Sequence, residues 1–120
     1  DVLNEEGKSI KGSKILVLGL AYKANVDDCR ESPSFVLMEK LEKKGATIQY
    51  HDKYVPEVPP TREHSHFTGK KSVDIEDQYD LILLSTDHKE YKTFDFTSFQ
   101  SPMVDTRNCI QMKPIKYFQA

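Results

Sequence analysis

A short charged segment, residues 22–33, carries the side chains best suited to bind a ligand. Lys23 and Arg30 stand among carboxylates, and the segment ends in Ser32 and Pro33. Serine followed by proline favours the start of a helix, because serine can cap the first N–H groups and proline has no N–H to lose. A helix N-terminus carries unpaired N–H groups and partial positive charge, so the segment predicts an anion site. The alternative is a solvated loop in which Arg30 only pairs with neighbouring carboxylates.

The same segment does not make a dinucleotide site by itself. Such a site needs the spacing G-x-G-x-x-G directly before a helix, and only Gly19 is present here. Asp52, which follows another partly apolar segment, has two interpretations. An acidic residue at that place can bind a ribose in a Rossmann half, or it can serve only in a turn.

Cysteine and histidine residues are weaker candidates. Cys29 precedes the predicted helix start, where a thiol can be acidified, but the adjacent carboxylates disfavour a thiolate. We therefore interpret Cys29 and Cys109 as noncatalytic. His64 and His66 are spaced as metal ligands can be, yet no third ligand is near in sequence, so we expect solvated loop residues and no metal site. His88 either lines a cleft or caps a helix.

Apolar runs and alternating patterns predict the elements that position these residues. Residues 14–22 form a near-continuous apolar run, typical of a strand buried on both faces. A helix is expected from Pro33 to Gly45, where glycine suits the C-terminal cap. Further strands are predicted at 46–51, 80–86 and 103–105, with a surface loop at 53–71 and one or two helical turns at 73–79. Residues 91–99 are a weakly helical segment, and its Phe94, Phe96 and Phe99 are expected in the core. Residues 110–118 form a poorly defined tail.

Strands that alternate with helical segments predict an α/β fold, a three-layer Rossmann-like sandwich with a mostly parallel central sheet. In such sheets ligands bind outside the carboxyl ends of the strands. This rule selects four segments as candidate binding regions, namely residues 21–30, 52–54, 86–88 and 105–108.

The composition excludes several function classes. The chain has 120 residues, with 17 Lys and Arg against 19 Asp and Glu, a formal charge of −2, and 38% hydrophobic residues. This fits one globular domain, and no apolar stretch reaches the roughly 18 residues of a membrane span. Near-neutral charge without a basic run argues against nucleic acid as a partner. Two distant cysteines without CxxC spacing indicate a reducing cytoplasm rather than a disulfide framework.

The first dozen residues are mostly polar, with only three apolar side chains. They favour neither a buried strand nor an amphipathic helix. We therefore interpret residues 1–12 as a linker from a preceding region and residues 13–120 as the folded domain. The chain is then expected to be a fragment of something longer.

The longest motifs follow one another in a characteristic order: GLAYKANVDDCRESPS, a helix ending in KKGA, a strand ending in HD, and then DLILLSTDH and VDTRN. From about Ser13 to about Asn108 the chain resembles the C-terminal UDP-binding domain of the nucleotide-sugar 6-dehydrogenases. The amino-acid sequence of these motifs most resembles the UDP-N-acetylhexosamine branch, in particular UDP-N-acetylglucosamine 6-dehydrogenase. One departure is Lys53, which stands where the family normally has a proline after Asp52.

The resemblance implies an enzyme of polysaccharide biosynthesis that oxidises the C6 alcohol of a UDP-sugar to a carboxylate, in two hydride transfers to NAD. Tyr22 and Lys23 match family positions that contact the UDP-sugar. Arg107 matches a position that contacts its nucleotide part. Arg30 matches an arginine that reaches NAD, which is held mainly by the N-terminal domain. The family's catalytic cysteine also lies in another domain, so this domain alone should be inert.

The implied partners are a UDP-sugar, NAD and the missing N-terminal and central domains of the same chain, with a homodimer expected for the full-length enzyme. A hypothesis from a different class is a free-standing α/β regulatory or protein-interaction module, with the charged loop as its contact surface. The two differ in a simple observation, because only a UDP-binding domain should melt at a higher temperature when UDP is present.

Overall fold

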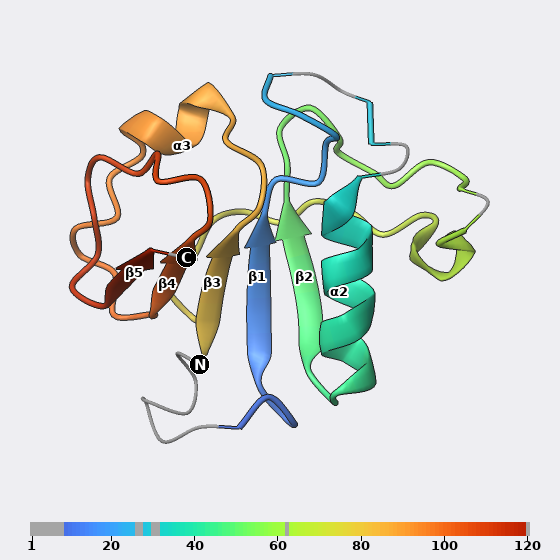
Figure 1. Cartoon of the computed structure of the whole chain (residues 1–120), viewed down its shortest axis with the longest axis horizontal. Helices are drawn as coiled ribbons and strands as arrows, with labels where there is room; N and C mark the ends of the chain where they lie inside the picture. The colour runs from blue at the N-terminus through green and yellow to red at the C-terminus, as the bar shows by residue number, and fades with distance from the viewer. Residues whose placement is uncertain (1–8, 26–27, 30–31, 62, 120) are drawn as a thin grey trace.

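The computed structural model describes residues 9–25, 28–29, 32–61 and 63–119. Within them, five strands form one sheet in the order β2-β1-β3-β4-β5, and every pairing is parallel (Figure 1). The strands are β1 (Lys14–Leu18), β2 (Thr47–His51), β3 (Leu81–Leu84), β4 (Met103–Asp105) and β5 (Tyr117–Gln119). The predicted α/β fold with a mostly parallel central sheet is confirmed.

Strand β1 lies inside the sheet, between β2 and β3, and its last four residues are buried. The apolar run predicted a strand as far as Tyr22, but β1 ends at Leu18 because the chain turns at Gly19. This residue has φ 93°, and a Cβ atom there would lie 2.5 Å from the Cβ of Thr86. Glycine therefore permits both the left-handed turn and the close approach of the loop after β3.

Helix α2 (Pro33–Lys43) begins and ends as its sequence predicts. The Ser32 hydroxyl accepts a hydrogen bond from the Ser34 amide, and proline occupies the first turn. At the other end the amide of Gly45 donates to Glu42 and that of Ala46 to Leu41, with Gly45 at φ 95°. This pattern is a Schellman motif, which glycine favours.

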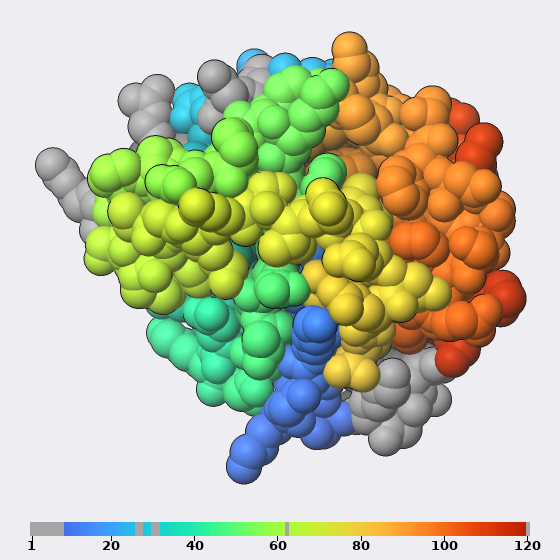
Figure 2. Space-filling view, turned by 180° about the vertical axis from the view of Figure 1, so that it is seen from behind, coloured from blue at the N-terminus to red at the C-terminus, as the bar shows by residue number. Residues whose placement is uncertain are grey.

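Two hydrophobic clusters cover the two faces of the sheet. On one face, Phe35 and Met38 of α2 pack on Ile15, Val17 and Ile48. On the other face lie the aromatic residues Tyr91, Phe96 and Phe99, as expected for core residues, with Phe94 packed against them. Figure 2 shows the chain that leads to β3, in yellow, crossing the side of the molecule opposite the view of Figure 1.

The prediction of helical turns at 73–79 is wrong, because this segment is irregular and its amides bond elsewhere. Val73 donates to the carbonyl of Tyr50, and Tyr79 donates to the Ser101 hydroxyl. The Asp77 carboxylate accepts the amide of Ser101. An irregular segment therefore stands where one or two helical turns were expected.

Two further elements differ from the prediction, and one agrees with it. Helix α3 is short (Lys89–Thr93), so the helical part of residues 91–99 ends before Phe94. The tail at 110–118 leads into β5, which pairs with β4. The proline-containing loop at 53–71 is confirmed, and it includes one 3-10 turn, η1 (Ser65–Phe67). No helix in the described part of the chain has the length and apolar character of a membrane span.

Candidate functional site

The carboxyl ends of β1, β2, β3 and β4 lie along one edge of the sheet, because all of these strands run in the same direction (Figure 1). The four segments selected from the sequence are the loops that follow these strands. They therefore meet at one edge, which is where ligands bind in parallel α/β sheets. The following contacts show how each loop is held.

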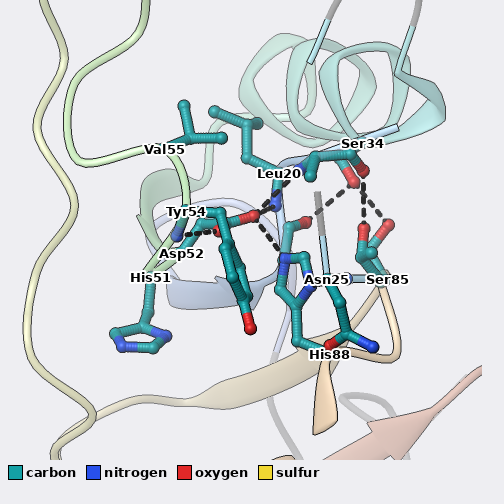
Figure 3. Close-up of polar contacts among 12 residues, drawn as sticks. Leu20, Asn25, Ser34, His51, Asp52, Tyr54, Val55, Ser85 and His88 are labelled. Carbon is teal, nitrogen blue, oxygen red and sulfur yellow. Dashed lines mark hydrogen bonds and ion pairs between the residues drawn. The ribbon is translucent and has the colours of Figure 1, made fainter. Parts of the chain in front are cut away.

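Asp52, the first residue after β2, is fully buried and joins three of these loops. Its Oδ2 atom accepts the amide of Leu20 at 2.7 Å and that of Ala21 at 2.9 Å. Oδ2 also lies 2.8 Å from Nε2 of His88, and Oδ1 accepts the amide of Tyr54 at 2.8 Å (Figure 3). These contacts occupy the carboxylate, so the turn interpretation of Asp52 holds and the ribose interpretation does not.

The charge state of Asp52 follows from the same contacts. Burial alone raises the pKa of this carboxyl, but the hydrogen bonds from His88, Ala21 and Leu20 outweigh it and hold the pKa below its ordinary value. Asp52 is therefore a carboxylate at neutral pH, and it can only accept hydrogen bonds.

His88 is buried beside Asp52 and does not line an open cleft. Its Nδ1 atom lies 2.8 Å from the backbone nitrogen of Asn25. The Asn25 side chain in turn accepts the amide of Lys89 at 2.9 Å. His88 occupies the N-cap position of α3, but its side chain makes no capping bond there, so the helix-cap interpretation is also wrong.

Small hydroxyl residues hold the first part of the β1 loop. The Thr86 hydroxyl donates to the carbonyl of Ala21 at 2.9 Å, and the Ser34 hydroxyl donates to that of Gly19 at 2.9 Å. Ser34 and Ser85 are 2.6 Å apart through their hydroxyl oxygens. These hydroxyl groups tie the loop after β1 to α2 and to the segment after β3. No sequence signal distinguishes these serine and threonine residues from others.

Tyr22 and Lys23 lie on this anchored loop with their side chains exposed; Tyr22 has 53% of its surface accessible. The amide of Tyr22 donates to the carbonyl of Asp28 at 2.6 Å, so the loop backbone is held next to Lys23. Arg30, the predicted contact to NAD, lies outside the described residues.

Asp105, the last residue of β4, is a second buried carboxylate. It accepts the amides of Arg107 at 3.0 Å, Cys109 at 2.8 Å and Ile110 at 3.0 Å, and the Tyr117 hydroxyl at 2.7 Å. Burial raises the pKa of Asp105, but these bonds outweigh it and the pKa lies below its usual value. An acidic residue at the end of a short strand, before a turn, is the signal that could have identified this role.

Arg107 is exposed on the loop that Asp105 holds, and its Nε atom donates to the carbonyl of Ser85 at 3.2 Å. It lines an open cavity of about 640 Å³ together with Lys92, Lys113 and mostly polar neighbours. Arg107 and Lys23 therefore follow strands of the same sheet edge. Both loops contact the segment after β3, through Ser85 and His88 respectively.

The remaining candidates have structural surroundings. Cys29 is buried, and burial raises the pKa of the Cys109 thiol to about 11, so this thiol is protonated at neutral pH. His64 lies 3.1 Å from Glu39 and stacks on Phe35, so it packs against α2 and is not the solvated residue we expected. Among the described residues, no group of three or more His, Cys, Asp or Glu could hold a metal ion.

Comparisons with known proteins identify the relatives of this chain. Residues 16–112 match the model of the UDP-glucose/GDP-mannose dehydrogenase family, UDP binding domain. The chain is 30% identical to UDP-glucose 6-dehydrogenase of Rhizobium meliloti over 112 residues, covering 89% of the chain and 26% of that protein. It is 32% identical to UDP-N-acetyl-D-mannosamine dehydrogenase of Pyrococcus horikoshii over 119 residues, covering 93% and 26%.

A solved structure shows the same fold. The UDP-D-ManNAc dehydrogenase from Pyrococcus horikoshii superposes with a TM-score of 0.74 at 25% identity, over 98% of this chain and 28% of that one. The chain thus spans about a quarter of the length of the relatives it matches.

Proposed function

Because the chain belongs to the UDP-glucose/GDP-mannose dehydrogenase family, as its UDP binding domain, we propose that the carboxyl edge of its sheet binds a UDP-sugar. One observation carries the proposal: two exposed cationic side chains, Lys23 and Arg107, stand on loops that buried carboxylates hold at this edge. A UDP-sugar presents a diphosphate, and fixed cations suit it better than mobile ones, since less side-chain and loop freedom is lost on binding.

The two cations suit different parts of the ligand. The Lys23 ammonium is a compact charge for diphosphate or sugar oxygens. The planar guanidinium of Arg107 can form two parallel bonds to a phosphate or bond a carbonyl of the base. Tyr22, whose ring is half exposed, supplies a further contact to the UDP-sugar.

We propose that the domain acts within a longer NAD-dependent enzyme that oxidises the C6 alcohol of a UDP-sugar to a carboxylate. NAD carries the hydride chemistry and is held mainly by another domain, with Arg30 reaching toward it. The domain at 13–120 contributes one wall of the cleft, where it orients the sugar and helps to exclude water. The amino-acid sequence of the motifs most resembles the UDP-N-acetylhexosamine branch of the family, which favours a UDP-N-acetylhexosamine as substrate.

The thiol chemistry of the reaction is proposed to come from elsewhere in the enzyme. Cys29 is buried and the Cys109 thiol has a raised pKa, so neither resembles an activated nucleophile. The chain alone should therefore not reduce NAD with any UDP-sugar. We further propose a cytoplasmic enzyme, since both cysteines are thiols, and a homodimer of the full-length protein.

Thermal unfolding in the presence of UDP and UDP-sugars tests the binding proposal. A ligand that binds only the folded chain raises the melting temperature. Lys23→Ala and Arg107→Ala should each weaken UDP binding about tenfold or more, because each removes a charge-assisted hydrogen bond. Their melting temperatures without UDP should stay near that of the wild type, since both side chains are exposed.

Lys44→Ala is the matched control. Lys44 is exposed and lies at the C-terminal end of α2, which is at the amino edge of the sheet (Figure 1). This change also removes one positive charge, but UDP should raise its melting temperature as much as that of the wild type. If UDP raised the melting temperatures of Lys23→Ala and Arg107→Ala as much as that of the wild type, the ligand would bind elsewhere.

A further inference from the structure

We propose that His88 is a positioning residue for the UDP-binding loop: it holds the backbone of Asn25, and thereby Lys23, in the geometry that receives the ligand. The inference rests on the proposed role of Lys23, because His88 itself is buried and would not touch the ligand. It assigns a function to a side chain that lies between a buried carboxylate and a loop backbone (Figure 3).

The hydrogen bonds around His88 fix its tautomer. A backbone N–H can only donate, so Nδ1, which lies 2.8 Å from the Asn25 nitrogen, must be the nitrogen without a proton. Nε2 then carries the proton and donates to Oδ2 of Asp52 at 2.8 Å. Asp52 therefore selects the one tautomer in which His88 can accept from Asn25.

The ring is also held by packing. The centroid of His88 lies 4.6 Å from that of Tyr54 and 5.7 Å from that of Tyr91. With Asp52 at one nitrogen and rings beside it, the imidazole has little freedom to turn. Nδ1 is therefore held facing the Asn25 amide, from which it accepts a hydrogen bond.

Asn25 is the point at which this acceptor acts on the loop. Its φ is 63°, a left-handed conformation that is uncommon for a residue other than glycine and that asparagine tolerates better than most. The loop after β3 holds it twice, through His88 Nδ1 on its amide and through the Lys89 amide on its side chain. Contacts of this kind are what keep a sparsely populated backbone conformation in place.

Lys23 lies between two anchored residues. Before it, the amide of Tyr22 bonds the carbonyl of Asp28, and after it Asn25 is bonded as described. The side chain of Lys23 is exposed, so the backbone sets the point from which it extends. Removing the acceptor at Nδ1 should therefore free the end of the loop and weaken ligand binding without a direct contact being lost.

Two variants separate the two nitrogens of His88. In His88→Asn the amide oxygen stands near the place of Nδ1 and can accept from Asn25, but the side chain is too short to reach Asp52. In His88→Gln the amide nitrogen stands near the place of Nε2 and can donate to Asp52, but no acceptor faces Asn25. Both variants lose the packing on Tyr54 and Tyr91, so they are matched in that respect.

Binding of UDP, measured by calorimetry, gives the first result. His88→Gln should bind UDP about tenfold more weakly than the wild type, whereas His88→Asn should stay within about threefold. The amide signals of Lys23 and Asn25 in nitrogen-15 spectra should move in His88→Gln and stay near their wild-type positions in His88→Asn. Equal binding of UDP by wild type and His88→Gln, or equal losses in both variants, would overturn the proposal.

The wild-type chain supplies a test that needs no variant to fold. Nitrogen-15 spectra of the histidine rings distinguish the tautomers, and His88 should carry its proton on Nε2 alone. A proton on Nδ1 would overturn the proposal. If the wild type failed to bind UDP while the tautomer and the amide signals agreed with expectation, the proposed function would fail and the anchoring of the loop by His88 would stand.

Discussion

At the scale of single residues, two buried carboxylates organise the edge of the sheet. Asp52 accepts amides of the loop that bears Lys23, and Asp105 accepts amides of the loop that bears Arg107. Each sits at the end of a strand, where backbone N–H groups of the following loops would otherwise be buried without partners. Asp52 and Asp105 thus stabilise the loops at this edge, and the side chains of Lys23 and Arg107 stay exposed.

Asp52→Asn tests this role by removing the charge at nearly constant shape. The amide nitrogen would face a group that also donates, so one buried N–H would lose its acceptor. We expect the free energy of unfolding, measured with urea at neutral pH, to fall by about 2–4 kcal/mol. Asp74→Asn, at an exposed carboxylate, is the control and should change it by less than about 0.5 kcal/mol.

The stability difference between the wild type and Asp52→Asn should also depend on pH. Because the folded-state pKa of Asp52 is lowered, its stabilisation is fully present above the unfolded value, about 3.9, and is lost as the pH falls through the folded value. The difference in stability between wild type and Asp52→Asn should therefore shrink in acid, below about pH 4. A difference that stayed constant down to acid would show that the charge of Asp52 does not contribute.

At the scale of elements, strands β1 to β4 and helix α2 were predictable because their signals are local. Buried parallel strands are continuous apolar runs, and α2 has a serine cap, an initial proline and a terminal glycine. The segment at 73–79 was misread, although Val73 and Ile75 alternate with the exposed Asp74 and Glu76, which is the period of an extended chain.

Other features of the elements could not be predicted from local patterns. Strand β5 has only three residues, all partly or largely exposed, so no apolar run marks it. The bond between Asn25 and His88 joins residues 63 positions apart, and it depends on how two loops meet. Motif order proposes Tyr22, Lys23 and Arg107 as site residues, and their side chains are exposed, but it says nothing of the residues that hold their loops.

The cap of α2 allows a quantitative prediction at this scale. Ser32→Ala removes the acceptor for the Ser34 amide and a weak contact to the carbonyl of Ala21, so unfolding in urea should need about 1–2 kcal/mol less. Ser98→Ala, in an exposed turn, should leave the stability within about 0.5 kcal/mol of the wild type. Equal stabilities of these two variants would contradict the capping role.

At the scale of the whole molecule, the parallel direction of the strands gathers the candidate residues on one edge. The fold class followed from the alternation of strands with helical segments, which leaves few topologies open. What covers one face of the sheet did not follow, since an irregular segment at 73–79 and a short helix, α3, stand where helical turns and a weakly helical segment were expected. The candidate binding edge depends on strand direction rather than on that covering layer.

The most direct test of the central claim is a titration of the nitrogen-15-labelled chain with UDP, followed through its backbone amides. If UDP binds at the carboxyl edge, the signals that move belong to the loops after β1, β3 and β4, around Lys23, Ser85 and Arg107, while those at the amino edge, such as Gly45, stay in place. Movement centred on the amino edge, or no movement at saturating UDP, would contradict this claim.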